Sequence, residues 1–141
     1  MTSARQASCV AIGGRGVLIE GPPGSGKSSL ALALIDRGAV LVGDDGVIVG
    51  NSDGRLIAAP HPNIAGIIEV RNLGLVQMPV SPPVALALVI RLDPEAPRFI
   101  DSAGMVTIAG ADLPLVRLFP DSPVLALRAE IALRTFGLMI S

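Results

Sequence analysis

Short apolar runs alternate with turn-forming clusters along this chain, a pattern that predicts many strands and few helices. The runs at residues 8–12 and 16–20 flank a Gly-Gly-Arg turn and predict two short strands around it. Residues 28–37 carry apolar side chains at helical spacing, followed by a glycine that is typical of a helix end. Residues 39–42 then predict a buried strand. This part of the chain therefore reads strand, loop, helix, strand, which is one βαβ crossover.

The pattern changes after this crossover. Short β-branched or aliphatic runs, separated by Asn, Asp, Gly and Pro clusters, predict further strands at residues 47–49, 55–59, 67–70, 74–78, 84–91 and 105–108. The next convincing helix covers residues 124–136. One crossover helix, many strands and a C-terminal helix predict an α/β fold with a mixed, partly antiparallel sheet. A length of 141 residues predicts one domain, residues 1–141.

A phosphate-binding loop is the strongest chemical signal in the sequence. Residues 21–28, GPPGSGKS, match the pattern G-x-x-x-x-G-K-[ST] in full, with a strand before and a helix after. The glycines let backbone N–H groups turn toward phosphate oxygens, Lys27 reaches the β and γ phosphates, and the Ser28 hydroxyl can ligate Mg²⁺. We therefore expect ATP and Mg²⁺ as cofactors. The expected nucleotide-binding residues are Gly21, Gly24, Ser25, Gly26, Lys27, Ser28 and Ser29.

Two adjacent acids, Asp44 and Asp45, close the strand that follows the helix. Strand ends of this kind project side chains toward the crevice that holds the phosphates. One carboxylate can hold Mg²⁺ while the other accepts a proton from an attacking hydroxyl, and such a base is typically worth about 10²–10⁴ in rate. Asp-Gly between two hydrophobic strands is also a hairpin signal, and both interpretations can hold at once.

Glu69 and Arg71 fall on the same side of a short strand that runs into a turn. Such a pair is usually an exposed ion pair of little energetic value. If it faces the phosphates, Arg71 can stabilise the transferred charge and Glu69 can assist the metal. The catalytic candidates are then Asp44, Lys27 and Arg71, and the metal candidates are Ser28, Asp45 and Glu69.

Three other positions carry weaker signals. Asp93 ends an apolar run like the acid-terminated strand of an ATPase, but it precedes Pro94, and Asp-Pro commonly opens a turn. His61 lies in a loop without partner ligands, so we expect no metal there. Cys9 is expected to be a small buried hydrophobe in its strand.

Charge and hydropathy exclude several classes of partner. With 11 Lys and Arg against 12 Asp and Glu, the net charge of −1 provides no general reason to bind nucleic acid or an anionic membrane. Three Phe, with no Trp or Tyr, offer no platform on which the bases of a strand stack. The longest aliphatic run, residues 84–90, is far short of the ~20 residues that span a bilayer. A single cysteine and the lack of an export signal predict a cytoplasmic protein.

The ordered set of motifs resembles one family, the catalytic domain of HPr kinase/phosphorylase. The segments that carry the resemblance are GVLIEGPPGSGKSSLALALIDRGAVLVGDDGVIV and IIEVRNLGLV, and the similarity runs from about residue 6 to residue 90. It implies a P-loop domain similar to that of phosphoenolpyruvate carboxykinase. It also implies ATP-dependent phosphorylation of a serine of the phosphocarrier protein HPr in phosphotransferase-system regulation, with phosphorolysis of phospho-HPr as a weaker expectation.

The resemblance also implies roles for particular residues. Asp44 is the implied base toward the target serine, Ser28 and the nearby acids contact the metal, and Glu69 and Arg71 belong to the family's signature stretch. The family forms hexamers, so the resemblance implies a homo-oligomer. The matched motifs begin near residue 6 and leave a much shorter C-terminal part than in the full-length enzyme, so the resemblance implies the short form found in alphaproteobacteria, which we expect to lack the family's N-terminal regulatory domain.

Two alternative functions remain open. The chain has Gln6 where the family often has a histidine, Ser29 where an acidic residue commonly follows the Lys-Ser, and Asn72 in place of a usual glycine. Gln6 and Ser29 favour a nucleotide-binding regulator with weak or no kinase activity. The other alternative is a small-molecule P-loop kinase, which needs an arginine-bearing lid and further βαβ units that residues 47–108 lack. A GTP switch is disfavoured, since no N-K-x-D motif occurs.

Overall fold

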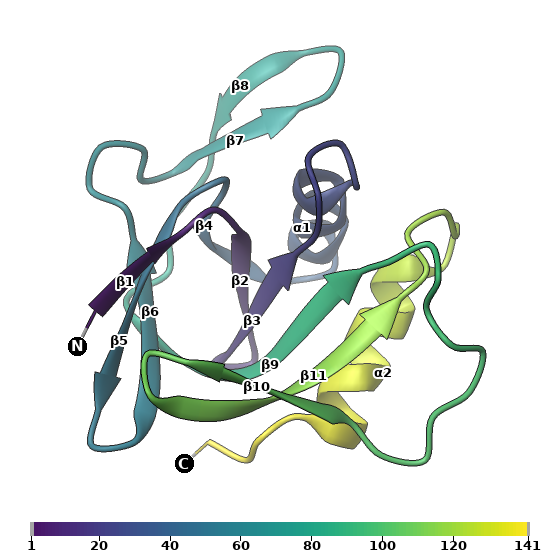
Figure 1. Cartoon of the computed structure of the whole chain (residues 1–141). Helices are drawn as coiled ribbons and strands as arrows, with labels where there is room; N and C mark the ends of the chain where they lie inside the picture. Colours follow the sequence, from purple (N-terminus) through teal and green to yellow (C-terminus); the bar gives the residue numbers. More distant parts are fainter. Residues whose placement is uncertain (1, 141) are drawn as a thin grey trace.

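A strand-rich α/β fold with two helices forms the described part of the chain (Figure 1). The structure is a computed structural model, and it describes residues 2–140. In chain order the elements are β1 (Thr2–Arg5), β2 (Ser8–Ile12), β3 (Arg15–Glu20), α1 (Lys27–Asp36), β4 (Val40–Gly43), β5 (Val47–Ser52), β6 (Arg55–Pro60), β7 (Ile67–Val70), β8 (Gly74–Gln77), β9 (Val84–Leu92), β10 (Gly104–Ile108), β11 (Ala111–Leu118) and α2 (Leu125–Phe136).

Nine of these strands form one mixed sheet around the central strand β9. The main path runs β1-β5-β6-β9-β3-β2-β4, and β11 pairs with β9 on one side and β10 on the other. β9 is parallel to β3 and β11, whereas the remaining pairs of this sheet are antiparallel. β7 and β8 form a separate antiparallel hairpin. The expected mixed, partly antiparallel sheet is therefore confirmed.

The elements predicted from the pattern are present, with two additions and one change of topology. The crossover helix and the C-terminal helix are confirmed as α1 and α2. The sequence pattern missed β1, which is short, and β11, which contains Pro114; a proline inside an apolar run usually argues against a strand. The crossover β3–α1–β4 joins two strands that run in the same direction, but β2 lies between them and is antiparallel to both.

The hairpin predicted at Asp45-Gly46 is wrong. Asp45 does turn the chain in a left-handed conformation, with φ 58°. However, β4 pairs with β2, whereas β5 pairs with β1 and β6 in the other half of the sheet. The strands on either side of this turn therefore diverge, because each finds its hydrogen-bond partners in a different part of the sheet.

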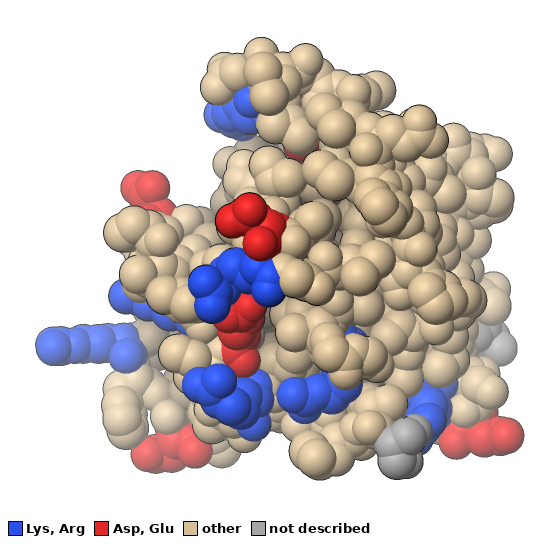
Figure 2. Space-filling model, turned by 180° about the vertical axis from the view of Figure 1, so that it is seen from behind, with Lys and Arg blue, Asp and Glu red and all other residues tan. Residues whose placement is uncertain are grey.

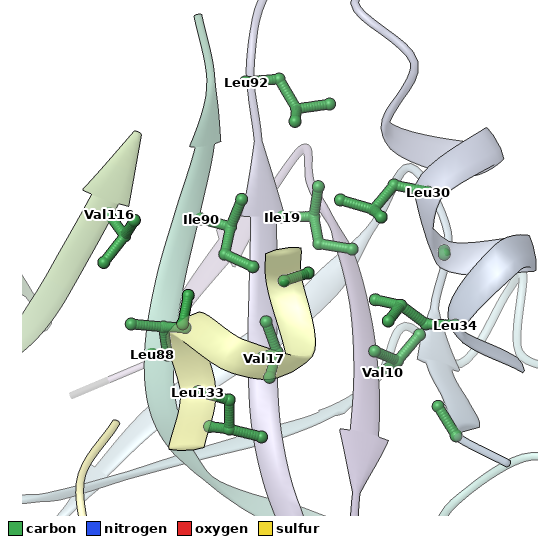
Figure 3. Close-up of a cluster of buried hydrophobic side chains, with 14 of the residues drawn as sticks. Val10, Val17, Ile19, Leu30, Leu34, Leu88, Ile90, Leu92, Val116 and Leu133 are labelled. Atoms are coloured by element: carbon green, nitrogen blue, oxygen red, sulfur yellow. The ribbon is translucent and has the colours of Figure 1, made fainter. Parts of the chain in front are cut away.

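Two apolar layers hold the sheet in place. On one face, Val17 and Ile19 of β3 and neighbouring side chains of β9 pack against α1 and α2, as Figure 3 shows for Leu34 and Leu133. On the opposite face, Leu18 packs in a second cluster that includes side chains of β5 and β6, so the sheet bends back on itself. Alternating residues of β3 thus serve the two layers, as expected for a strand buried on both faces.

The strand directions place several loops at one edge of the sheet. β3, β9 and β11 are mutually parallel, and β4 runs the same way as β3 because both are antiparallel to β2. Their carboxyl ends therefore face the same edge. The segments that follow them, residues 21–26, 44–46, 93–94 and 119–121, emerge there, and in open α/β sheets this is the edge where ligands bind.

Candidate functional site

The glycine-rich loop opens directly onto the N-terminus of α1. The helix begins at Lys27 after Gly26, which has a left-handed φ of 99° that glycine adopts without strain. No side chain caps this end, and its first turn contains no acidic residue. The first backbone N–H groups of the helix have no partner within the helix, and they carry the positive end of its dipole. This end is therefore suited to an anion such as phosphate.

Two side chains, those of Lys27 and Ser25, lie beside this helix N-terminus, which together with the loop is here called the anion cradle. The Lys27 ammonium donates to the carbonyl oxygens of Gly21 at 2.8 Å and Pro22 at 3.4 Å, which folds it back along the loop. The Ser25 hydroxyl is buried and has no hydrogen-bond partner among the described residues. A Cβ atom on Gly21 would lie 2.6 Å from the Ser25 Oγ and 3.2 Å from the Leu92 carbonyl oxygen, so a larger residue at this first loop position would force its neighbours to shift.

Asp44 is the most firmly held polar side chain of the site. Its residue is 6% exposed, and its carboxylate accepts three hydrogen bonds. Ser28 Oγ donates to Oδ1 at 2.6 Å, Ser8 Oγ donates to the same oxygen at 2.8 Å, and the Glu69 backbone N–H donates to Oδ2 at 2.9 Å. The carboxylate that follows β4 is thus bonded directly to the hydroxyl of the phosphate loop, and it faces the cradle.

A pocket of about 240 Å³ gathers these groups. Its lining comprises Ser8, Pro23, Gly24, Ser25, Gly26, Lys27, Ser28, Ser29, Asp44, Asp45, Glu69 and Arg71. The structure therefore brings together every site residue expected from the sequence except Gly21, which contributes through its carbonyl bond to Lys27. The sequence analysis missed Ser8. A serine opening an otherwise apolar strand was a faint signal, but its proximity to Asp44 depends on the pairing of β2 with β4.

The signature stretch lines the same pocket from the β7–β8 hairpin. Glu69 is in β7 and Arg71 is in the turn that follows, and both side chains are exposed. No carboxylate of the described residues lies within the 4.0 Å ion-pair distance of Arg71 or Lys27. The pair is not the exposed ion pair that was the simpler expectation. Instead, two cations and three carboxylates share one cavity without neutralising one another directly.

The donor set fits a metal that is shared with a ligand. Among the described residues, no group of three His, Cys, Asp or Glu side chains forms a protein cage for an ion. The pocket does present the hydroxyl oxygen of Ser28 and the exposed carboxylate of Asp45. Mg²⁺ usually keeps water and binds one or two carboxylates together with phosphate oxygens. These oxygen ligands therefore suit Mg²⁺ bound with a polyphosphate.

The weaker candidates lie outside this pocket. Asp93 follows β9, where it accepts a hydrogen bond from the Glu95 backbone N–H at 2.8 Å and lies 3.5 Å from Arg117. This is the arrangement of a turn opener. His61 Nδ1 accepts from the Asn63 N–H at 3.3 Å within its own loop. Cys9 is fully buried, as expected, and loss of solvation raises the pKa of its thiol to about 12.

Charges outside the pocket are largely balanced. Glu20, just before the loop, accepts from the Arg91 Nε at 2.8 Å and lies 3.5 Å from Arg5, so its negative charge is compensated beside the anion cradle. On the face turned away in Figure 1, acidic and basic side chains are intermixed, with broad uncharged areas between them (Figure 2). Neither arrangement is typical of a surface that binds a long polyanion.

The fold and the site together define the class of protein. Its described residues form an α/β fold with two helices, in which a glycine-rich loop, a helix N-terminus and a hydroxyl-bound aspartate meet at one edge of a mixed sheet, an arrangement suited to an anion. The sequence model of the family described as HPr Serine kinase C-terminal domain matches residues 1–81. The chain belongs to this family, which confirms the resemblance drawn from its motifs.

Individual relatives agree with this assignment. A Chlorobaculum tepidum protein named HPr kinase/phosphorylase is 34% identical over 142 aligned residues, which cover 89% of this chain and 42% of the relative. A Clostridium tetani protein of the same name is 46% identical over 66 residues, 47% of this chain and 22% of the relative. The chain thus spans less than half the length of these curated relatives.

A solved structure matches over most of the length of both chains. The structure described as the Hpr(Ser) kinase/phosphatase from Coxiella burnetii superposes with a TM-score of 0.83 at 27% identity, covering 94% of each chain. Both helices of the described residues are too short or too polar to cross a membrane.

Proposed function

We propose that this protein is an ATP- and Mg²⁺-dependent kinase that phosphorylates a serine of HPr. The observation that carries the proposal is the bond from Ser28 of the phosphate loop to Asp44, in one pocket with Lys27 and Arg71. This arrangement sets a carboxylate next to the place where the loop would hold a terminal phosphate. The names of the relatives support HPr as the acceptor. Regulation of a phosphotransferase system is the setting that the family resemblance implies.

The chain's own residues would divide the work. The first N–H groups of α1 and the Lys27 ammonium would bind the β and γ phosphates, and Arg71 would stabilise the charge on the phosphoryl group in transit. Ser28, Asp45 and Glu69 would supply oxygen ligands toward Mg²⁺. When bound, the ion neutralises phosphate charge and orients the terminal group for in-line attack.

Asp44 would act as the base. Its Oδ1 already accepts two hydroxyl bonds, whereas Oδ2 accepts one backbone bond, so Oδ2 is the oxygen with room for a further donor. The acceptor serine would pass its hydroxyl proton to Oδ2 as its oxygen bonds the terminal phosphorus. The bond from that phosphorus to the ADP oxygen breaks, and ADP leaves.

The proposal extends to the rest of the molecule. Residues 1–141 would form one catalytic domain of the P-loop type related to phosphoenolpyruvate carboxykinase, which the single crossover helix after the phosphate loop supports. We place the protein in the cytoplasm, where HPr would be its partner, and we expect no nucleic-acid or membrane partner. Self-association into a homo-oligomer and phosphorolysis of phospho-HPr are part of the same proposal.

A transfer assay tests the central claim. Labelled ATP with Mg²⁺ should label cognate HPr and should leave HPr unlabelled when its target serine is replaced by alanine. Asp44→Asn should lower transfer by at least ~10²-fold, the usual contribution of a general base, and should retain nucleotide binding. Asp53→Asn is the matched control, since Asp53 also has a positive φ but lies outside the pocket.

Two outcomes would decide against the proposal. Nucleotide binding without transfer to HPr under any condition would leave the regulator as the better assignment. Full transfer by Asp44→Asn would remove Asp44 as the base. The reverse reaction has its own readout, because phospho-HPr incubated with inorganic phosphate should release pyrophosphate if phosphorolysis occurs.

A further inference from the structure

A second pocket adjoins the phosphate cradle. It has a volume of about 580 Å³ and shares six lining residues with the first pocket, among them Ser29 and Arg71. Its other walls come from the loop proline Pro22, from Pro94 after β9, and from the segment Phe119-Pro120-Asp121 after β11. The phosphate loop is therefore the common wall of two connected spaces at the same edge of the sheet.

We propose that this second pocket, here called the nucleoside pocket, takes the base and ribose of the bound nucleotide, with Phe119 packed against the base. The inference rests on the proposed function, because it requires the loop to bind a nucleoside polyphosphate. The nucleoside pocket would be the part of the molecule that distinguishes ATP from an inorganic polyphosphate.

The distribution of carboxylates sets the direction of the ligand. Asp44, Asp45 and Glu69 line the first pocket but not the second. Metal binding and proton transfer require these acids, so the terminal phosphate belongs in the first pocket. The chain of phosphates would then run along the shared loop residues, and the nucleoside end would emerge in the second pocket.

The chemistry of the nucleoside pocket suits an uncharged aromatic group. Phe119 is 43% exposed at the end of β11, and Pro94 and Pro120 add apolar surface beside it. An aromatic ring left open beside a phosphate loop can stack on a base, which is worth roughly tenfold or more in affinity. Asp121 makes this space unfavourable for another phosphate, but its carboxylate can accept hydrogen bonds from ribose hydroxyls.

A comparison of two ligands tests the inference. Calorimetry with Mg²⁺ would measure the dissociation constants of ATP and of inorganic tripolyphosphate for the wild-type chain and for Phe119→Ala. We expect the wild type to bind ATP at least about tenfold more tightly than tripolyphosphate. Phe119→Ala should weaken ATP binding about tenfold and leave tripolyphosphate binding within about twofold.

Matched variants guard against indirect effects. Phe99→Ala removes another exposed ring, 78% exposed and outside both pockets, and it should change neither constant. Phe119→Trp keeps an aromatic face and should preserve the preference for ATP. Because Phe119 is largely at the surface, its truncation should leave the thermal unfolding midpoint close to that of the wild type.

The possible failures can be told apart. Equal wild-type affinity for ATP and tripolyphosphate, or an unchanged ratio in Phe119→Ala, would overturn the nucleoside pocket while leaving the phosphate loop and the kinase proposal intact. An unchanged ratio together with a higher KM for HPr would assign the pocket to the acceptor instead. Failure of both ligands to bind the wild type would refute the proposed function and this inference together.

Discussion

Replacing Ser8 tests how Asp44 is held. Ser8 is 0% exposed, and its hydroxyl donates to Asp44 Oδ1 at 2.8 Å. Ser8→Ala removes this hydrogen bond to a charged group, and such bonds contribute about 1.5–3 kcal/mol. The carboxylate keeps its donors from Ser28 at 2.6 Å and from the Glu69 backbone at 2.9 Å. We therefore expect a loss at the low end of this range, about 1.5 kcal/mol in the free energy of unfolding.

Urea unfolding of single and double variants measures the interaction. In the background of Asp44→Ala the Ser8 hydroxyl is buried without its acceptor, so Ser8→Ala should then cost nothing or even stabilise the fold. By thermal unfolding the single substitution should lower the midpoint by about 3–6 °C. If Asp44→Ala does not fold, Asp44→Asn, which removes the charge and replaces one acceptor oxygen with an NH2 donor, should still reduce the cost of Ser8→Ala.

Ser81→Ala is the control for this cycle. Ser81 is also buried, at 8% exposed, but its hydroxyl donates to the neighbouring Pro82 carbonyl at 2.7 Å. Its substitution should cost the same with or without Asp44. Additive effects of Ser8→Ala and Asp44→Ala, within about 0.3–0.5 kcal/mol, would refute the coupling and with it the idea that Ser8 positions the carboxylate.

Two further predictions concern the loop and the core. Gly21→Ala should destabilise the protein by about 1–3 kcal/mol and weaken phosphate binding, because its Cβ would lie 2.6 Å from Ser25 Oγ and 3.2 Å from the Leu92 carbonyl oxygen. Gly104→Ala, whose nearest neighbour would be 3.6 Å away, should be nearly neutral in the same urea titration. Cys9 should not react with a thiol reagent in the native protein at pH 8 and should react once it is unfolded, because burial raises its pKa from 9.0 to about 12. Since the native thiol stays protonated while the unfolded one ionises, the free energy of unfolding should fall as the pH rises from about 9 to about 12. Subtracting the free energy of unfolding of Cys9→Ala from that of the wild type isolates this contribution, and an increase in the difference over that pH range would contradict the assignment.

Local patterns were sufficient for most elements of the fold. The helix after the phosphate loop begins at Lys27, one residue from the predicted start, because the loop glycines and the apolar spacing that follows act over a few residues. β11 was missed because Pro114 obscures its apolar pattern, although the strand pairs along both of its edges. The wrong hairpin prediction at Asp45 has a similar cause, because a sequence pattern reports only on residues close together in the chain. An Asp-Gly turn reports the local backbone but not the partners of the strands beside it.

The sequence by itself determined the phosphate loop, the helix behind it and the set of charged residues available for chemistry, since each depends on residue type and close spacing. Only the tertiary structure decided that Ser8 shares Asp44 with Ser28 and that Phe119 lies beside the loop. Ser8 and Asp44 are 36 positions apart in the chain, and Ser28 and Asp44 are 16 apart. These contacts exist because the strand order places the start of β2 beside the ends of β3, β4, β9 and β11 at one edge of the sheet, and no local pattern records that order.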